Sequence, residues 1–458
     1  MSSIAIQWRD RARVLRSMQR MIEADEAMAQ AHALAPDDRL IAFLHAQSRY
    51  ELGYPAADLF AQVCRLWPDN PDALRNQAMA LAGEGDVGGA VDLLSAALGQ
   101  DPQWLDGHRV LASLRWVAGD AQDFDASYAA AARAHPRAQG LWLGWFSAVA
   151  QHRDWPRACA ILDEAERHLG QTKPLTEARL FIASESGNGA ETARLLAATS
   201  AWDDPFIQIA RIRAALRAGD PARALSIALP LAQAAPGSPL AGQAWPYVST
   251  CWRLLDDPRR CWLDDDFVRS MDVGLGEGDL NELGECLRAL HVAQLPYPEQ
   301  SVRGGTQTDR SVLLRHEPIL QRVREALMAA VKDYVAALPA PDPTHPLLSR
   351  PRHDLRISGS WSVRLTGGGY NIPHSHPMGW ISSAFYVSLP EDDAPAPAGH
   401  FHYGAPPPEL GLDLAPYATI APRRGHLVLF PSTLWHGTVP TTSGERLNIA
   451  FDIVPVQA

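Results

Sequence analysis

Proline and glycine recur in the first half of the chain at a spacing of about 34 residues. The prolines in phase are Pro36, Pro68, Pro102 and Pro136. The glycines in phase are Gly53, Gly85, Gly119, Gly187 and Gly219. A constant period of this length indicates stacked repeats, in which each unit buries its apolar face against its neighbours. The first half of the chain is therefore predicted to be an elongated repeat array.

One unit is clearest between Asn70 and Pro102. An apolar stretch follows Asn70, the pair Gly85-Asp86 interrupts it, and a second apolar stretch begins near Ala90. Glycine permits a tight turn, alanine allows two helices to approach closely, and proline ends the second helix. The pattern predicts one helical hairpin per unit. The phase weakens between residues 160 and 210, and Arg153 stands near one expected glycine.

This combination of period and phase resembles the tetratricopeptide repeat over residues 20–255. The resemblance implies a helical solenoid with a concave face that can bind a peptide or protein partner. A solenoid that binds no ligand is an equally open interpretation.

Charge and cysteine content restrict the possible partners and compartments. The chain has 41 basic and 52 acidic residues, a formal net charge of −11, so nucleic acid is not an expected partner. The five cysteines show no CxxC spacing, which indicates a reducing compartment. Neither a membrane-spanning run nor a secretory signal is apparent, so we expect a cytoplasmic protein without a membrane partner.

The pattern changes after residue 255. Residues 256–345 are expected to form a helical lead-in that contains a polar loop at 300–308 and an amphipathic helix at 318–338. From residue 358 onward, short apolar or alternating stretches are separated by Gly- and Pro-rich turns, which predicts a β-sandwich or barrel. The expected organisation is multidomain α + β: repeats at 1–255, the lead-in at 256–345 and a β core at 346–458.

Three features in the β region are candidates for metal binding or catalysis. His374 and His376 are separated by one residue before a predicted strand, and side chains at i and i+2 of an extended segment can face one point. His436 lies at the end of a later strand. Arg446 follows ten residues beyond it and shares a predicted strand face with Asn448. Each feature alone is weak, but their order is distinctive.

That order resembles the jelly-roll oxygenases that use Fe(II) and 2-oxoglutarate, whose motif is His-x-Asp/Glu…His. Residues 358–364, 374–387, 424–432 and 434–440 are similar to the putative 2OG-Fe(II) oxygenase family often fused to tetratricopeptide arrays, as are 300–308 and 344–348. The resemblance spans about residues 260–455. It implies a double-stranded β-helix, Fe(II) as metal, and 2-oxoglutarate and dioxygen as cosubstrates.

The resemblance also implies residue roles. His374 and His436 would be metal ligands. His376 stands where the family's wider superfamily has its carboxylate and is the expected third ligand, although this departure from the motif leaves that position open to question. Asp392 and Asp393 do not fit the spacing. Arg446 would pair with the far carboxylate of 2-oxoglutarate, because a guanidinium fork matches a carboxylate. Asn448, Ser383 and, less favoured, Arg364 are further candidates for this pocket. His400 and His402 are expected to face outward, with Phe401 and Tyr403 inward.

The main expectation is therefore a 2-oxoglutarate-dependent oxygenase that hydroxylates a C–H bond of a peptide, protein or small molecule. Two alternatives stay open. The first is a non-catalytic repeat scaffold whose barrel has lost its metal. The second is a three-histidine, cupin-type dioxygenase that needs no cosubstrate and would be indifferent to loss of Arg446.

Overall fold

A repeat array and a β domain together form the molecule. The computed structural model describes residues 3–264, 266–297, 300–390 and 396–456. The array contains fifteen helices within that described part of the chain: α1 Ser3–Ser17, α2 Met21–Leu34, α3 Arg39–Glu51, α4 Ala57–Leu66, α5 Pro71–Gly83, α6 Val87–Gln100, α7 Leu105–Val117, α8 Ala126–Ala134, α9 Gln139–Ala150, α10 Trp155–Leu169, α11 Lys173–Glu185, α12 Gly189–Ala198, α13 Pro205–Arg217, α14 Pro221–Ala234 and α15 Pro239–Leu254.

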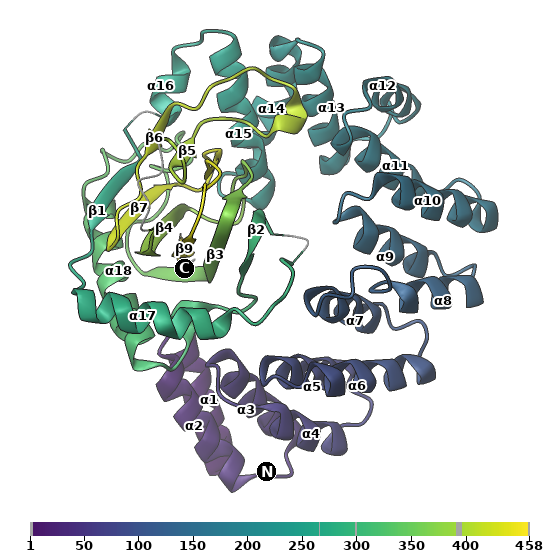
Figure 1. Ribbon diagram of the computed structural model, residues 1–458, viewed down its shortest axis with the longest axis vertical. Helices are drawn as coiled ribbons and strands as arrows, with labels where there is room; N and C mark the ends of the chain where they lie inside the picture. Colours follow the sequence, from purple (N-terminus) through teal and green to yellow (C-terminus); the bar gives the residue numbers. More distant parts are fainter. Residues whose placement is uncertain (1–2, 265, 298–299, 391–395, 457–458) are drawn as a thin grey trace.

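The helices pack as successive antiparallel pairs that follow an arc (Figure 1). The five in-phase glycines all lie in turns with positive φ, between +72° and +96°. Arg153, which replaces a glycine, adopts the same region at φ +60°. Glycine adopts left-handed backbone without a steric penalty, so the spacing of the glycines in the sequence reflects the spacing of the turns between helices. The predicted tetratricopeptide-like solenoid is confirmed.

The C-terminal part contains two antiparallel sheets. Its strands are β1 Arg269–Asp272, β2 Val302–Gln307, β3 Leu355–Asn371, β4 Ile381–Ser388, β5 Phe401–Tyr403, β6 Ala418–Ile420, β7 His426–Pro431, β8 His436–Thr438 and β9 Glu445–Pro455. One sheet has the order β1-β7-β4-β9-β3-β2, and the other has the order β6-β5-β8. From β4 to β9 the chain crosses repeatedly between the two sheets, which is the connectivity of the predicted double-stranded β-helix.

Alternation along the strands builds a core on each face of the six-stranded sheet. Leu447, Ile449, Phe451 and Ile453 of β9 face a large cluster that includes helices α17 (Glu277–Leu290) and α18 (Pro318–Ala336). Tyr386, Phe401 and Phe430 belong to a second cluster between the two sheets. The opposite face of β9 therefore lines the interior of the β domain.

The lead-in is not purely helical, which corrects the sequence expectation. Besides α16 (Arg259–Asp264), α17, α18 and the short 3-10 helix η1 (Val312–Leu314), it supplies β1 and β2 at the two edges of the larger sheet. Residues 300–308, expected to form a polar loop, contain β2, which pairs with β3 across a register shift between Arg303 and Gly305. Only Val302 of β2 is fully buried, so the strand lacks the apolar alternation that marks a half-buried strand in a sequence.

The array contacts the β domain at both of its ends (Figure 1). Near the N-terminus, the Gln19 side chain donates to the Ile357 carbonyl at 2.7 Å and accepts from the Ile357 N–H at 3.1 Å. At the other end, the Trp435 indole N–H donates to the Pro246 carbonyl of α15 at 3.1 Å. Midway, Trp116 of α7 donates to the Pro296 carbonyl at 2.9 Å. The concave face of the array therefore looks onto the β domain.

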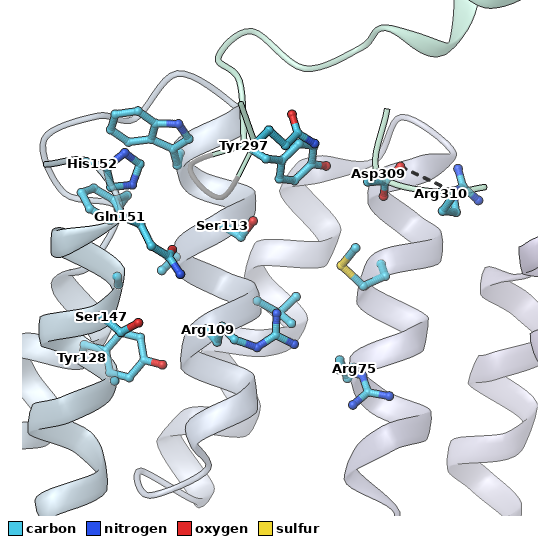
Figure 2. Close-up of a pocket in the computed structure, with 18 of the residues that line it drawn as sticks. Arg75, Arg109, Ser113, Tyr128, Ser147, Gln151, His152, Tyr297, Asp309 and Arg310 are labelled. Atoms are coloured by element: carbon cyan, nitrogen blue, oxygen red, sulfur yellow. Dashed lines mark ion pairs between the residues drawn. The ribbon is translucent and has the colours of Figure 1, made fainter. Parts of the chain in front are cut away.

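A cavity of about 580 Å³ lies on this concave face (Figure 2). Side chains from the inner helices α5, α7 and α9 meet Tyr297, Asp309 and Arg310 from the segments that flank β2. Among the described residues, no helix has the length and apolar character needed to cross a membrane.

Candidate functional site

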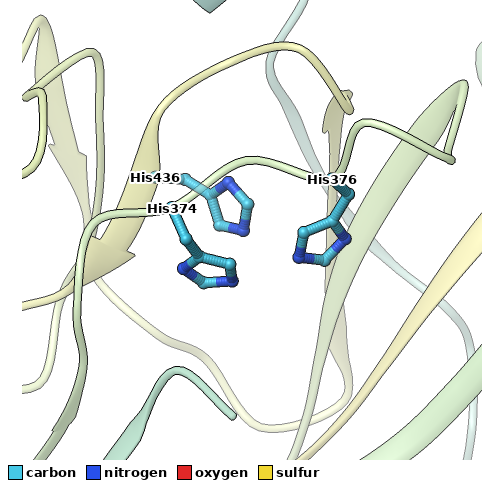
Figure 3. A group of neighbouring side chains, drawn as sticks. All are labelled: His374, His376 and His436. Atoms are coloured by element: carbon cyan, nitrogen blue, oxygen red, sulfur yellow. The ribbon is translucent and has the colours of Figure 1, made fainter. Parts of the chain in front are cut away.

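Three histidines converge at one end of the β domain (Figure 3). His374 and His376 lie in the segment between β3 and β4, and His436 is the first residue of β8. One ring nitrogen from each lies within 4.8 Å of the others. The backbones of His374 and His436 are joined by reciprocal hydrogen bonds of 2.9 and 3.0 Å. The cluster is thus held by the main chain as well as by side-chain packing.

Hydrogen bonds to carbonyls orient two of the three rings. Nδ1 of His374 lies 2.7 Å from the Ile372 carbonyl, and Nδ1 of His436 lies 3.0 Å from the Leu434 carbonyl. A carbonyl only accepts, so both Nδ1 atoms carry the proton and each Nε2 keeps its lone pair. Burial lowers the pKa of His374 to about 3, and burial, then the neighbouring histidines, hold that of His436 well below its usual value. Both rings are therefore neutral, as metal ligation requires.

His376 is oriented by a buried carboxylate. Its Nδ1 lies 2.7 Å from Oδ1 of Asp452, and the Ser382 hydroxyl donates to the same Oδ1 at 2.6 Å. The His376 backbone N–H donates to the Ser432 carbonyl at 2.9 Å. Asp452 is only 8% exposed. A carboxylate bonded to the far nitrogen of a ligating histidine fixes its ring and raises its basicity, and such a partner is a common feature of metal sites.

Asp452 was not found by the sequence analysis, although a signal for it exists. It continues the alternation of Arg446, Asn448 and Ala450 along β9, so all four side chains share the interior face. Its pairing with His376, 76 residues away, depends on the register that places Asp452 opposite Ser382. A single sequence does not specify that register.

Arg446 lies in the same interior cavity as the histidines. The cavity is lined by His374, His376, His436, Arg446 and Asn448, among others. Arg446 is 2% exposed, and its Nε and Nη1 atoms have no hydrogen-bond partner among the described residues. The Tyr386 ring lies 5.1 Å from its guanidinium carbon, and burial raises the pKa of Tyr386, so the phenol stays protonated. A buried guanidinium without a counter-charge is costly, which fits a pocket for an anion.

The other expected pocket residues divide into three cases. Asn448 lines the cavity as expected. Ser383 also lines it, but its hydroxyl donates to the Phe451 carbonyl at 2.8 Å and accepts from the Phe451 N–H, so its role is to join β4 to β9. Arg364 does not line the cavity, because it is bound to Glu445 at 2.6 Å. This outward pairing excludes it from the pocket.

The second histidine pair does not join the cluster. Phe401 is buried between the sheets with Tyr403 packed against the same cluster, as expected. His400 and His402 are partly exposed and lie outside the three-histidine group. The carboxylates Asp392 and Asp393 lie outside the described residues.

The last helix of the array supports the site directly. Trp435, adjacent to His436, is anchored on α15 through its indole N–H, which also approaches Thr250 Oγ1 at 3.2 Å. Gly242 of α15 lies against the histidine-bearing segment so closely that a Cβ there would be 2.3 Å from the Pro377 carbonyl oxygen. The repeat array is therefore part of the framework that fixes the histidines.

A family model matches residues 359–452, a segment that contains the three histidines, Asp452 and Arg446. The model describes the putative 2OG-Fe(II) oxygenases. The resemblance of this domain to that family, inferred from its motifs, is confirmed. No curated protein matches the chain.

Several solved structures are similar to parts of this chain. The viral collagen prolyl hydroxylase vCPH of Paramecium Bursaria Chlorella virus-1, in complex with 2OG, is 14% identical, covers 42% of this chain and 97% of its own, and gives a TM-score of 0.29. HygX from Streptomyces hygroscopicus, with nickel and 2-oxoglutarate bound, is 15% identical over 41% of this chain and 83% of its own, with a TM-score of 0.31. A tetratricopeptide repeat protein from Parabacteroides merdae is 15% identical over 54% and 89%, with a TM-score of 0.34.

Proposed function

We propose that this protein is an Fe(II)- and 2-oxoglutarate-dependent oxygenase that hydroxylates a C–H bond of its substrate. The observation that carries the proposal is the combination, in one cavity, of three converging histidines and a buried arginine whose Nε and Nη1 have no hydrogen-bond partner among the described residues. The family match over the same residues supports it. When bound, iron and 2-oxoglutarate would supply oxidative chemistry, in which dioxygen hydroxylates the substrate and converts the cosubstrate to succinate and carbon dioxide.

The proposed ligands are Nε2 of His374, His376 and His436. Two are directed to the site by carbonyls, and the third by Asp452. A set of three imidazole ligands lacks the negative charge of the usual carboxylate ligand. Asp452 supplies that charge one hydrogen bond further out, which makes His376 a more basic ligand. Three protein ligands would leave coordination positions for the cosubstrate and dioxygen.

Arg446 is proposed to hold the far carboxylate of 2-oxoglutarate. Its Nε and Nη1 donors are buried and unpartnered, and a bidentate guanidinium–carboxylate pair would satisfy both. The protonated Tyr386 hydroxyl and the Asn448 amide are additional donors on the same interior face. The Phe401 and Phe430 rings line the same cavity and supply its apolar wall.

The proposal is tested by an anaerobic titration of Fe(II) and 2-oxoglutarate into the metal-free protein. We expect a weak visible charge-transfer band from the chelated keto acid. His436→Ala should lose the metal and the band. Arg446→Met should retain Fe(II) but bind 2-oxoglutarate at least about thirtyfold more weakly, because one partner of a buried charge pair is removed.

Each alternative has its own outcome. Absence of both metal and band in the wild type would support a non-catalytic scaffold and refute the proposal. Metal binding that is indifferent to 2-oxoglutarate and to Arg446→Met would support the cupin-type dioxygenase instead. Arg364, which is half-buried and paired with Glu445 outside the cavity, is the matched control, and Arg364→Met should titrate like the wild type.

A further inference from the structure

The catalytic cavity opens toward the concave face of the repeat array. Beside the histidines lies a cavity of about 560 Å³, lined by His374, His376 and Trp361 on one side and by helices α9 to α11 on the other. It shares Gln151 and Gln300 with the concave cavity of Figure 2. That cavity in turn shares Tyr50, Tyr297 and Arg310 with a third one of about 650 Å³. A single small-molecule site spans roughly 300–1,000 Å³. Three adjoining cavities of this size suit a ligand longer than one small molecule.

The lining of these cavities combines aromatic rings with side-chain amides. The rings include Trp116, Phe124, Tyr128, Tyr297, Trp155, Phe181 and Trp361. The amides of the first two cavities are Asn76, Gln151, Gln300 and Gln307, and Gln294 lines the third. An amide side chain can both donate to and accept from a peptide backbone. Oε1 of Gln300, at the junction of the two cavities, is buried and has no hydrogen-bond partner among the described residues, so it can accept from a ligand N–H.

Among the described residues, one arginine that lines the cavity beside the histidines, Arg303, has no carboxylate partner. Of the charged side chains that line this cavity, Arg153 is paired with Glu409, and Glu185 is paired with Arg213 at 2.8 Å. Arg303 donates only to carbonyls, those of Gln300 at 2.9 Å and Val302 at 2.7 Å, and both bonds use Nη1. No ion pair to it is formed within the described residues.

The surroundings of Arg303 disfavour its own charge. Burial, and then the positive charge of Arg153, lower the pKa of Arg303. Because Arg153 and Glu185 are each in an ion pair, Arg303 leaves one positive charge without a carboxylate partner among the described side chains of this cavity, although the whole chain carries a formal net charge of −11. An anionic ligand group would relieve this repulsion and complete the guanidinium's hydrogen bonds. A carboxylate fits the planar fork best.

We propose that the substrate is an extended polypeptide segment that lies along the concave face and presents an acidic side chain to Arg303, beside the residue to be oxidised. This inference rests on the proposed oxygenase function and specifies its substrate class. Arg303 is a specificity-determining residue in it, while the ring and amide side chains of the array hold the rest of the segment.

The test uses the full-length protein with Fe(II) and 2-oxoglutarate under anaerobic conditions. Three pools of short fluorescent peptides would be compared, identical except for a central acidic, amide or basic residue. Fluorescence anisotropy gives the affinity of each pool. We expect the acidic pool to bind about tenfold or more tightly than the amide pool, the range of a charge-assisted hydrogen bond. Arg303→Met should abolish this preference, and Arg303→Lys should restore it in part.

Two controls separate this inference from the oxygenase proposal. Arg322→Met, which removes an exposed arginine of α18 paired with Glu282, should leave the preference unchanged. The charge-transfer band should persist in Arg303→Met, which shows that the variant is folded and its metal site intact. An acidic amino acid blocked at both ends represents a small-molecule acid, and we expect it to bind much more weakly than the acidic pool.

Equal binding of the three pools, no binding of any pool, or equal binding of the blocked amino acid would overturn the inference. If the band is present in any of these cases, the oxygenase proposal stands while the substrate class is wrong. If the band is absent from the wild type, the oxygenase proposal itself fails.

Discussion

Replacement of Asp452 by asparagine should weaken metal binding without removing a ligand. The asparagine oxygen can still accept from Nδ1 of His376, 2.7 Å from Oδ1 in the wild type, so the ring orientation is retained while the negative charge is lost. Loss of such a partner typically lowers metal affinity about 10- to 100-fold, or about 1.4–2.7 kcal/mol. We expect the upper half of this range, because Asp452 is 8% exposed and poorly screened by solvent.

The assay is a competition titration of Fe(II) against a chelator under anaerobic conditions. Asp264→Asn is the matched control, since Asp264 is also 8% exposed and accepts from the Ser249 and Tyr417 hydroxyls, away from the histidines. Both variants lose a buried carboxylate, but only Asp452→Asn should lose metal affinity. Asp452→Ala, which also removes the hydrogen bond, should be at least as severe as Asp452→Asn. Wild-type Fe(II) affinity in Asp452→Asn would refute the idea that this carboxylate compensates for the absent acidic ligand.

Two further predictions concern the framework and its acid sensitivity. Gly242→Ala places a Cβ 2.3 Å from the Pro377 carbonyl oxygen, so it should destabilise the protein by about 1–3 kcal/mol and also weaken Fe(II) binding. Gly99→Ala, whose Cβ would have nothing within 4 Å, is the control and should leave stability and Fe(II) binding intact. Equal behaviour of the two variants in thermal melts and metal titrations would contradict this coupling. Burial lowers the pKa of His291 to about 4, so the folded protein excludes a proton that the unfolded chain takes up below about pH 6.5. The free energy of unfolding should therefore fall by about 1–3 kcal/mol as the pH drops from about 6.5 to about 4. His291→Gln should reduce this slope in pH-dependent melting curves, and an unchanged slope would count against the assignment.

Local patterns were enough to predict the repeats and most of the site. The in-phase glycines predicted the turns because each requires a backbone region that other residues avoid. Alternation placed Arg446 and Asn448 on one strand face, and the spacing of His374, His376 and His436 predicted the cluster. These are properties of short segments, or of motifs whose order along the chain is distinctive.

Features that depend on long-range register could not be predicted. The sequence of β2 predicts a loop because only Val302 in it is fully buried, and its pairing with β3 appears only in the fold. The bond between Asp452 and His376 joins residues 76 positions apart, and that between Gln19 and Ile357 joins residues 338 apart. Long-range contacts such as that between Gln19 and Ile357 close the array onto the β domain. The row of cavities that reaches the histidines depends on this closure.

We propose that the three histidines and Arg446 together form one site for iron and 2-oxoglutarate. This proposal is tested most directly by a crystal structure grown anaerobically with Fe(II) and 2-oxoglutarate, with anomalous data collected at the iron edge. We expect one strong peak facing Nε2 of His374, His376 and His436, with the cosubstrate's far carboxylate on Arg446. No peak at the histidines, or a bound cosubstrate that does not contact Arg446, would contradict it.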